Sequence, residues 1–385
     1  MEQGSASLDV DRPCRPSAEP ADARRGPDRT VVALAVATMV GTFALVVLGS
    51  TVRVTDSGMG CPSWPLCYGH IGPVDRYHAL LEQSHRYLVA LVTVGTFSTA
   101  FLARRSRARR MAFVPASVAA LLVLVQAALG ALTVFAKNAP WTVALHLVVG
   151  LVFLGTTAVT AVSTVRARHG SWTMVAVGRW GGALLLVTLA TIVAGSLVVA
   201  NGAGGVCPSW PLCPSSAPGL ADWQLVHRSL AGLTGVALVA FVWGRWRPVG
   251  RWPAWRASAL ASGGAYIAVA GFGAASAVSR AAASWQDVHL AMAALLWVLV
   301  VATVTALATL GEPWLPPTFV RDKPKSGYGI VLATTDLDAT VSQVDERCAP
   351  AGRSRSTSKM STSMAVPAEP AAGSSTEWNA RFPSG

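Results

Sequence analysis

The sequence predicts an all-α integral membrane protein with eight transmembrane helices, built as two tandem four-helix bundles with parallel pseudo-two-fold symmetry. Three observations lead to this fold class. The 385-residue chain is 52% hydrophobic and 13% charged, with a mean hydropathy of +0.46, whereas soluble proteins carry about 25% charged residues. Eight apolar runs are each about 20 residues long, which is enough to cross a bilayer as a helix. The heptapeptide CPSWPLC at residues 61–67 recurs unchanged at 207–213, which indicates an internal duplication.

The apolar runs are expected to be helices, because backbone polar groups in lipid must be satisfied within the segment. The predicted spans lie near residues 31–50, 85–103, 111–135, 141–165, 180–200, 225–243, 257–278 and 288–310. Each copy holds an even number of spans, so both copies enter the membrane in the same orientation, related by an axis along the membrane normal.

The domain organisation follows from these runs. The predicted parts are a disordered cytoplasmic segment 1–29, a four-helix unit 30–170, a second four-helix unit 171–311 and a disordered cytoplasmic tail 312–385. The two end segments are rich in Pro, Ser, Ala and Gly and could bury little apolar surface. The tail contains one strand-like patch at 330–334, which the sequence leaves isolated.

Basic residues gather at one end of the spans. The loops at 104–110, 166–179 and 245–256 hold five, three and four arginines, and three more precede the first span, whereas the opposite loops hold four basic residues. By the positive-inside rule, both termini face the cytoplasm. The net charge of +12 follows this membrane pattern and argues against nucleic acid as a partner. Residues 1–29 are polar, so no cleavable signal is evident.

Four histidines recur in matched positions near the outer ends of their spans. His85 recurs as His227, and His146 recurs as His289. An ionisable residue within a span is costly and marks a functional site by default, although any one of them could instead be a histidine hydrogen-bonded in the bundle. Two imidazoles from facing helices suit axial ligation of haem iron. Zinc or copper is less favoured, because each repeat offers only two buried nitrogens.

Other residues near the histidines fit a flat, anionic cofactor. Arg53, Arg86 and Arg228 lie on the outer side and could pair with haem propionates, with interfacial anchoring as the alternative. Three small residues would let a macrocycle approach: Gly150, Gly232 and Gly235.

Each copy carries one cysteine pair in an outer loop, where an oxidising compartment favours disulfides. We expect local pairing, of Cys61 with Cys67 and of Cys207 with Cys213, because the repeat makes each loop self-contained. A pair could staple its loop over the haem slot or provide reducible thiols. The staple is favoured for the second pair, and both roles stay open for the first. The two cysteines in the tails are expected to be free thiols.

The two copies differ at one acidic position. Glu82 lies three residues before His85, whereas Gln224 lies three residues before His227. A carboxylate beside a haem ligand can move protons, and a neutral amide cannot. This difference indicates that the first unit performs chemistry and the second holds a permanent cofactor. A carboxylate that merely faces water is the alternative for Glu82.

Eight spans, the tandem repeat, the paired histidines, the motif Glu82-x-x-His85-Arg86 and the twin cysteine loops together resemble bacterial haem A synthases over about residues 31–311. The resemblance implies oxidation of the C8 methyl of haem O to a formyl group, by successive hydroxylation and loss of water, to give haem A for terminal oxidases. It implies a haem b held by His227 and His289, substrate haem O engaged by His85 and His146, and a catalytic part for Glu82.

The resemblance also implies a place in the bacterial plasma membrane, with haem O synthase (protohaem farnesyltransferase) and terminal oxidase assembly factors as partners. Two other functions remain open at this point. A di-haem b-type electron carrier would use four equivalent ligands and would not need the difference between Glu82 and Gln224. A transporter built on parallel repeats would show broken helices or charges at the midplane.

Overall fold

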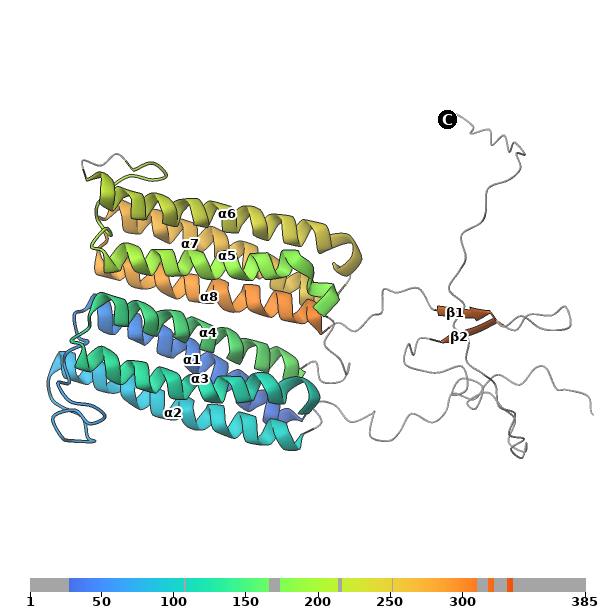
Figure 1. Ribbon diagram of the computed structural model, residues 1–385, viewed down its shortest axis with the longest axis horizontal. Coiled ribbons are helices and arrows are strands. Elements are labelled where there is room, and N and C mark those ends of the chain that lie inside the picture. The colour runs from blue at the N-terminus through green and yellow to red at the C-terminus, as the bar shows by residue number, and fades with distance from the viewer. Residues whose placement is uncertain are drawn as a thin grey trace, which may run out of the picture. The chain divides into compact units, whose positions relative to one another are not determined.

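The computed structural model describes residues 28–106, 109–165, 174–213, 217–250, 252–309, 318–321 and 331–334. Within these ranges the chain forms eight α-helices and two short strands (Figure 1). The helices are α1 (Arg29–Val54), α2 (Tyr77–Arg105), α3 (Arg109–Phe135), α4 (Pro140–Val165), α5 (Met174–Ala200), α6 (Pro218–Val249), α7 (Pro253–Val278) and α8 (Ala283–Ala308). All eight are long and apolar enough to cross a membrane, so the predicted all-α membrane fold is confirmed.

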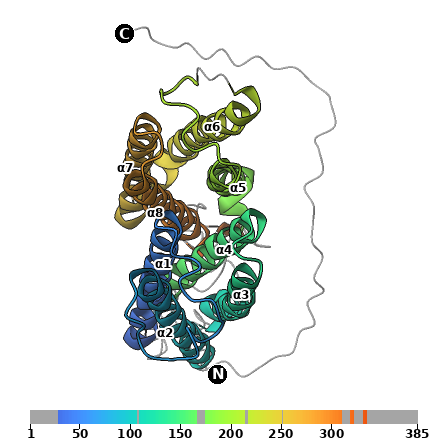
Figure 2. The ribbon, with the colours of Figure 1, turned by 90° about the vertical axis from the view of Figure 1, so that its left-hand side faces the viewer.

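The helices pack as two groups of four (Figures 1 and 2). In the first group α1 contacts α2 and α4, and α3 contacts the same two helices. In the second group α5 contacts α6 and α8, and α7 contacts the same two. The groups meet where α4 packs against α5 and α8 and where α1 packs against α8. The pseudo-two-fold relation between the groups stays a prediction.

Two helices begin earlier in the sequence than the hydropathy pattern predicts. α2 begins at Tyr77 and α6 at Pro218, whereas the predicted spans begin at 85 and 225. Their first turns carry polar residues, which lower the local hydropathy without interrupting the helix, and a proline at the first position of a helix is well tolerated. His85 and His227 therefore lie about two turns inside continuous helices rather than at their ends.

The interface between the two units contains two side-chain hydrogen bonds. The indole Nε1 of Trp297 in α8 donates to the carbonyl of Leu151 in α4 at 2.7 Å. At the outer end, Thr51 of α1 donates to Asp287 of α8 at 2.8 Å. The Trp297 contact forms within a buried apolar cluster from α4, α5 and α8. A Cβ at Gly155 would lie 3.0 Å from the same indole, so a glycine there leaves room for the tryptophan.

We expect Trp297→Phe to loosen this interface. The variant loses the donor to the Leu151 carbonyl, at a cost of about 1 kcal/mol, together with the packing of the larger ring. The loss should appear as a lower midpoint of thermal unfolding in detergent. Trp243→Phe is the matched control, because Trp243 is 83% exposed on the protein surface. Equal losses in the two variants would mean that the indole bond contributes nothing to the interface.

The two strands lie in a separate part of the chain. β1 (Thr318–Arg321) and β2 (Val331–Thr334) pair as a two-stranded sheet. The strand-like patch at 330–334 is therefore paired rather than isolated, and β-branched and aromatic residues such as Phe319 favour such pairing. Of the predicted disordered segment 1–29, Asp28 and Arg29 are ordered as the N-cap and first residue of α1; the other predictions of disorder, for the rest of 1–29 and of 312–385, concern residues outside the described ranges.

Candidate haem-binding sites

In the second unit, one histidine pair faces across the bundle. The rings of His227 in α6 and His289 in α8 have centroids 6.2 Å apart and lie at 86° to each other. Their Nδ1 atoms lie 3.0 Å from the backbone carbonyls of Thr191 and Val269, respectively. A carbonyl can only accept, so each Nδ1 carries the proton and each Nε2 is left as a free metal ligand.

The spacing of this pair fits one metal ion bound between the rings. An imidazole nitrogen binds a metal ion at about 2 Å, so two imidazoles on opposite sides of one ion have ring centroids about 6 Å apart. Among the described residues, no group of three or more His, Cys, Asp or Glu side chains could hold a metal ion. Two axial nitrogens without further protein ligands suit an iron whose other ligands come from a porphyrin.

Both histidines of this pair pack against a glycine of the neighbouring helix. A Cβ at Gly195 in α5 would lie 2.9 Å from Cε1 of His227, and a Cβ at Gly273 in α7 would lie 2.9 Å from Cε1 of His289. Real Cβ atoms essentially never approach so closely. The glycines therefore let each ring lie against a helix backbone, where the carbonyl one turn away accepts a hydrogen bond from the Nδ1–H.

The first unit repeats this packing at slightly longer distances. A Cβ at Gly49 would lie 3.2 Å from Nε2 of His85, and a Cβ at Gly130 would lie 3.6 Å from Cε1 of His146. The role of Gly130 was not predicted from the sequence. The signal was present, because Gly130 recurs as Gly273 at the same spacing as the histidines.

The glycines that the sequence suggested for macrocycle approach have other surroundings. Gly232 and Gly235 line a separate cavity with Tyr266, and a Cβ at Gly235 would collide with the Tyr266 ring and hydroxyl. Gly150 does lie near a histidine, but a Cβ there would meet the side-chain amide of Gln126. The macrocycle role of Gly232 and Gly235 stays a prediction, and the room at Gly150 is already taken by a protein group.

A cavity of about 790 Å³ lies in the first unit, within the range of about 300–1,000 Å³ typical of ligand sites. It brings together five of the residues singled out from the sequence: Arg53, Glu82, His85, Arg86 and His146. Its wall also includes Ser196 of α5 and Leu290 of α8, so the cavity reaches the second unit. His146 differs from the histidines of the second unit, because its buried Nδ1 has no hydrogen-bond partner.

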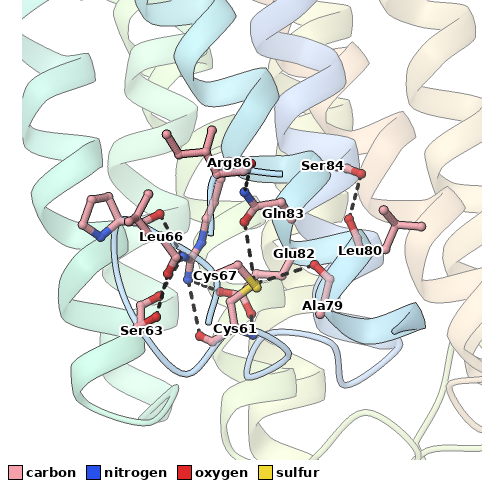
Figure 3. The surroundings of a disulfide bond; sticks show 12 residues. Cys61, Ser63, Leu66, Cys67, Ala79, Leu80, Glu82, Gln83, Ser84 and Arg86 are labelled. Carbon is pink, nitrogen blue, oxygen red and sulfur yellow. Dashed lines mark hydrogen bonds and ion pairs between the residues drawn. A yellow bond between two sulfur atoms is a disulfide. The ribbon is translucent and has the colours of Figure 1, made fainter. Parts of the chain in front are cut away.

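The outer loops are closed by disulfides and held by arginines. Cys61 is bonded to Cys67 and Cys207 to Cys213, each with the Cα atoms 4.8 Å apart. Figure 3 shows Arg86 pointing into the first loop. Its guanidinium donates to the carbonyls of Cys61 (3.4 Å), Ser63 (2.7 Å), Pro65 (3.1 Å) and Leu66 (3.2 Å). Arg228 donates in the same way to the carbonyls of Cys207 (3.4 Å), Ser209 (3.0 Å), Pro211 (2.9 Å) and Leu212 (2.8 Å).

These contacts change the interpretation of the three arginines. The guanidinium groups of Arg86 and Arg228 hold the loops, which is a role that sequence reasoning missed because it depends on where the loop carbonyls lie. Arg53 lines the cavity and remains the candidate for contact with a propionate. The position of Arg53 is occupied in the second repeat by Val199, so this basic group is specific to the first unit.

Glu82 is buried beside the first loop, only 6% exposed. One carboxylate oxygen accepts from the backbone N–H of Cys61 at 2.8 Å, and the other forms an ion pair with Arg86 at 2.6 Å (Figure 3). The alternative of a carboxylate that faces water is therefore excluded. Gln224 is equally buried, but its amide donates to the carbonyls of Ala203 and Gly204 at 2.9 and 3.1 Å. At the matching position, the first unit thus has a hydrogen-bond acceptor, the Glu82 carboxylate, and the second unit has a donor, the Gln224 amide.

The first loop segment has two attachments made by side chains that are not repeated in the second unit. Gln83 donates to the carbonyl of Ile71 at 3.2 Å, and the Tyr87 hydroxyl donates to the same carbonyl. The second repeat has Leu225 and Ser229 at these positions. The cavity wall therefore includes two residues, Gln83 and Tyr87, that the second unit does not repeat.

Comparison with known proteins places these features in context. The COX15-CtaA family model, described as cytochrome oxidase assembly protein, matches residues 32–301. The chain is 30% identical over 207 residues to the heme A synthase of Exiguobacterium sibiricum, covering 50% of this chain and 68% of that protein. It is 26% identical over 222 residues to the heme A synthase of Lysinibacillus sphaericus, covering 54% and 71%. A shorter match, 32% identical over 145 residues, is to the protoheme IX farnesyltransferase of Haloarcula marismortui, covering 37% and 30%.

Proposed function

The chain belongs to the COX15-CtaA family of cytochrome oxidase assembly proteins, and we infer from this membership and from its two unlike histidine pairs that it is a haem A synthase. The reaction oxidises the C8 methyl of haem O to a formyl group, through two hydroxylations and loss of water from the resulting gem-diol. The observation that carries the inference is the difference between the units. Both keep two histidines, but in the first they line a cavity of about 790 Å³ together with the buried carboxylate of Glu82, where the second unit has Gln224.

In this proposal the second unit holds a permanent haem b between His227 and His289. When bound, this group supplies one-electron redox chemistry. The protein keeps both imidazoles in the tautomer that ligates iron, through the carbonyls of Thr191 and Val269. Gln224 donates to backbone carbonyls beside this site and so supports the outer turn rather than moving a proton.

The first unit binds the substrate, haem O, between His85 and His146. Arg53 offers a charge for a propionate at the outer end of the cavity. Glu82 lines the same cavity, and its carboxylate takes or shares a proton as the methyl carbon is oxidised. The ion pair with Arg86 and the bond from the Cys61 N–H hold the carboxylate in place.

The test of the function is pigment analysis after co-expression with a source of haem O. The full-length protein should purify with haem b together with haem O or haem A, separated by chromatography of the extracted haems. Two equivalents of haem b and no haem A would contradict the proposal and favour a di-haem electron carrier. The match to a protoheme IX farnesyltransferase supports haem O synthase as a partner, with terminal oxidase assembly factors as further partners.

We place the protein in the bacterial plasma membrane with both termini in the cytoplasm, as the arginine distribution predicts. A membrane-impermeant thiol reagent, applied to intact cells after mild reduction, should therefore reach the CPSWPLC loops. Cys213 should react first, because it is only partly buried, whereas Cys61, Cys67 and Cys207 are fully buried. Cys14 and Cys348 serve as internal controls and should react only after lysis. Labelling of Cys213 only in lysed cells would reverse the proposed topology.

A further inference from the structure

One polar side chain in the wall of the first cavity has a role that the reaction scheme leaves open. Gln126 of α3 lines the cavity, and its Nε2 donates to the backbone carbonyl of His146 at 3.0 Å. Its Oε1 is buried and has no hydrogen-bond partner. A buried acceptor without a donor costs free energy, about 1–3 kcal/mol. The Oε1 of Gln126 is therefore a free hydrogen-bond acceptor in the cavity, next to His146, the proposed ligand of the substrate.

The missing donor lies on that same residue. The Nδ1 of His146 is also buried and without a partner. In the second unit the equivalent atom, Nδ1 of His289, bonds to the Val269 carbonyl at 3.0 Å. A histidine that ligates a metal almost always donates its other N–H to a carbonyl, carboxylate or water. His146 thus lacks the partner that a ligand needs, and the Oε1 of Gln126, whose amide already bonds to the His146 carbonyl, is an unused acceptor beside it.

The repeat shows that this arrangement is specific to the first unit. Gln126 occupies the position of Val269, and Gly150 occupies the position of Ala293, both at the spacing that relates His146 to His289. A Cβ at Gly150 would lie 2.8 Å from Nε2 of Gln126, closer than real Cβ atoms come. A Cβ at position 150 would therefore displace the Gln126 amide from its present position, and the second unit differs from the first at both residues.

We propose that Gln126 is a positioning residue for the substrate haem. Its Oε1 accepts a hydrogen bond from the Nδ1–H of His146 when that histidine ligates the iron of haem O. This inference rests on the proposed function. In the second unit the acceptor is a backbone carbonyl, which the helix fixes in place. In the first unit it is a side-chain amide on three rotatable bonds, which can pair with His146 or release it. A movable acceptor suits a site that must bind a haem and let it go.

The test is a titration of the full-length protein with haem O, using the haem b of the second unit as an internal measure of folding. Gln126→Met keeps the length of the side chain but removes the amide, and Gly150→Ala keeps the amide but displaces it. Both variants should bind haem O more weakly by about 10- to 100-fold, the usual effect of removing the partner of a metal-ligating histidine. Thr157→Val is the matched control, because it removes a buried hydroxyl of α4 that bonds within its own helix.

A second readout separates positioning from mere packing. The EPR g-values and midpoint potential of haem O bound in the first unit should change in Gln126→Met, because both respond to hydrogen bonding at the axial ligand. The haem b signals should stay unchanged. Parental affinity and parental spectra in Gln126→Met would overturn the inference while leaving the proposed function intact. If the parent protein bound no haem O at all, the proposed function would fail and the inference with it.

Discussion

His227→Ala and His289→Ala are each expected to purify without stably bound haem b. The rings of this pair are spaced for one iron, and each is held in its ligating tautomer by a backbone carbonyl. Even a residue that only orients a metal ligand contributes about 10- to 100-fold in affinity. Loss of an axial ligand itself should therefore lower haem b affinity by more than about 100-fold, measured by the haem content of the purified protein and its low-spin spectrum.

The matched control for this experiment is His85→Ala in the first unit. That variant should retain haem b, because His85 lines the cavity of the first unit, and in the proposed scheme it should fail to bind haem O. Full haem b in both His227→Ala and His289→Ala, with loss of haem b in His85→Ala, would exchange the roles of the two units.

Glu82→Gln should abolish formation of haem A while the fold and the haem b content remain. A positioned acid or base contributes about 10²- to 10⁴-fold to a rate, and an amide cannot replace it. The structure should tolerate the amide, because Gln224 occupies the matching buried position in the second unit. The measurement is the yield of haem A from supplied haem O, normalised to haem b.

The reciprocal variant, Gln224→Glu, should not create a second active site, because in the proposed scheme haem b occupies that unit. Its carboxylate would also lose the two bonds that Gln224 donates to backbone carbonyls, so a modest loss of stability is expected. Normal haem A yield from Glu82→Gln would show that the carboxylate is a bystander, despite its place in the cavity wall.

Most of the fold was predictable, because whether a segment spans a membrane as a helix depends mainly on the length and hydropathy of that segment itself. Apolar runs of about 20 residues define spans, and all eight appear in the structure. The outer starts of α2 and α6 were missed, because turns such as the one containing Glu82 are polar yet buried against a loop. Hydropathy measures the preference for lipid and carries no information about burial against protein.

The candidate site was partly predictable from the duplication. Identical positions revealed the histidine and cysteine pairs, and one unlike position revealed Glu82 against Gln224. The exchange of Gln126 for Val269 was equally visible in the repeat, but it acquired meaning only from the unpartnered atoms that the fold brings together. The contacts of Arg86 could not be anticipated, because they depend on loop carbonyls whose directions no local pattern specifies.

The arginine that holds each outer loop has a consequence for redox behaviour. In the first loop the two ends are joined twice, once through sulfur and once through a guanidinium that binds four carbonyls. Reduction of the disulfide removes only the first connection. The two thiols should then stay close together and shielded, so that the bond can re-form without a search through open conformations. We expect such a loop to tolerate repeated reduction and re-oxidation of its disulfide when the redox conditions change. The reversibility of disulfide formation would then depend on Arg86 as well as on the cysteines.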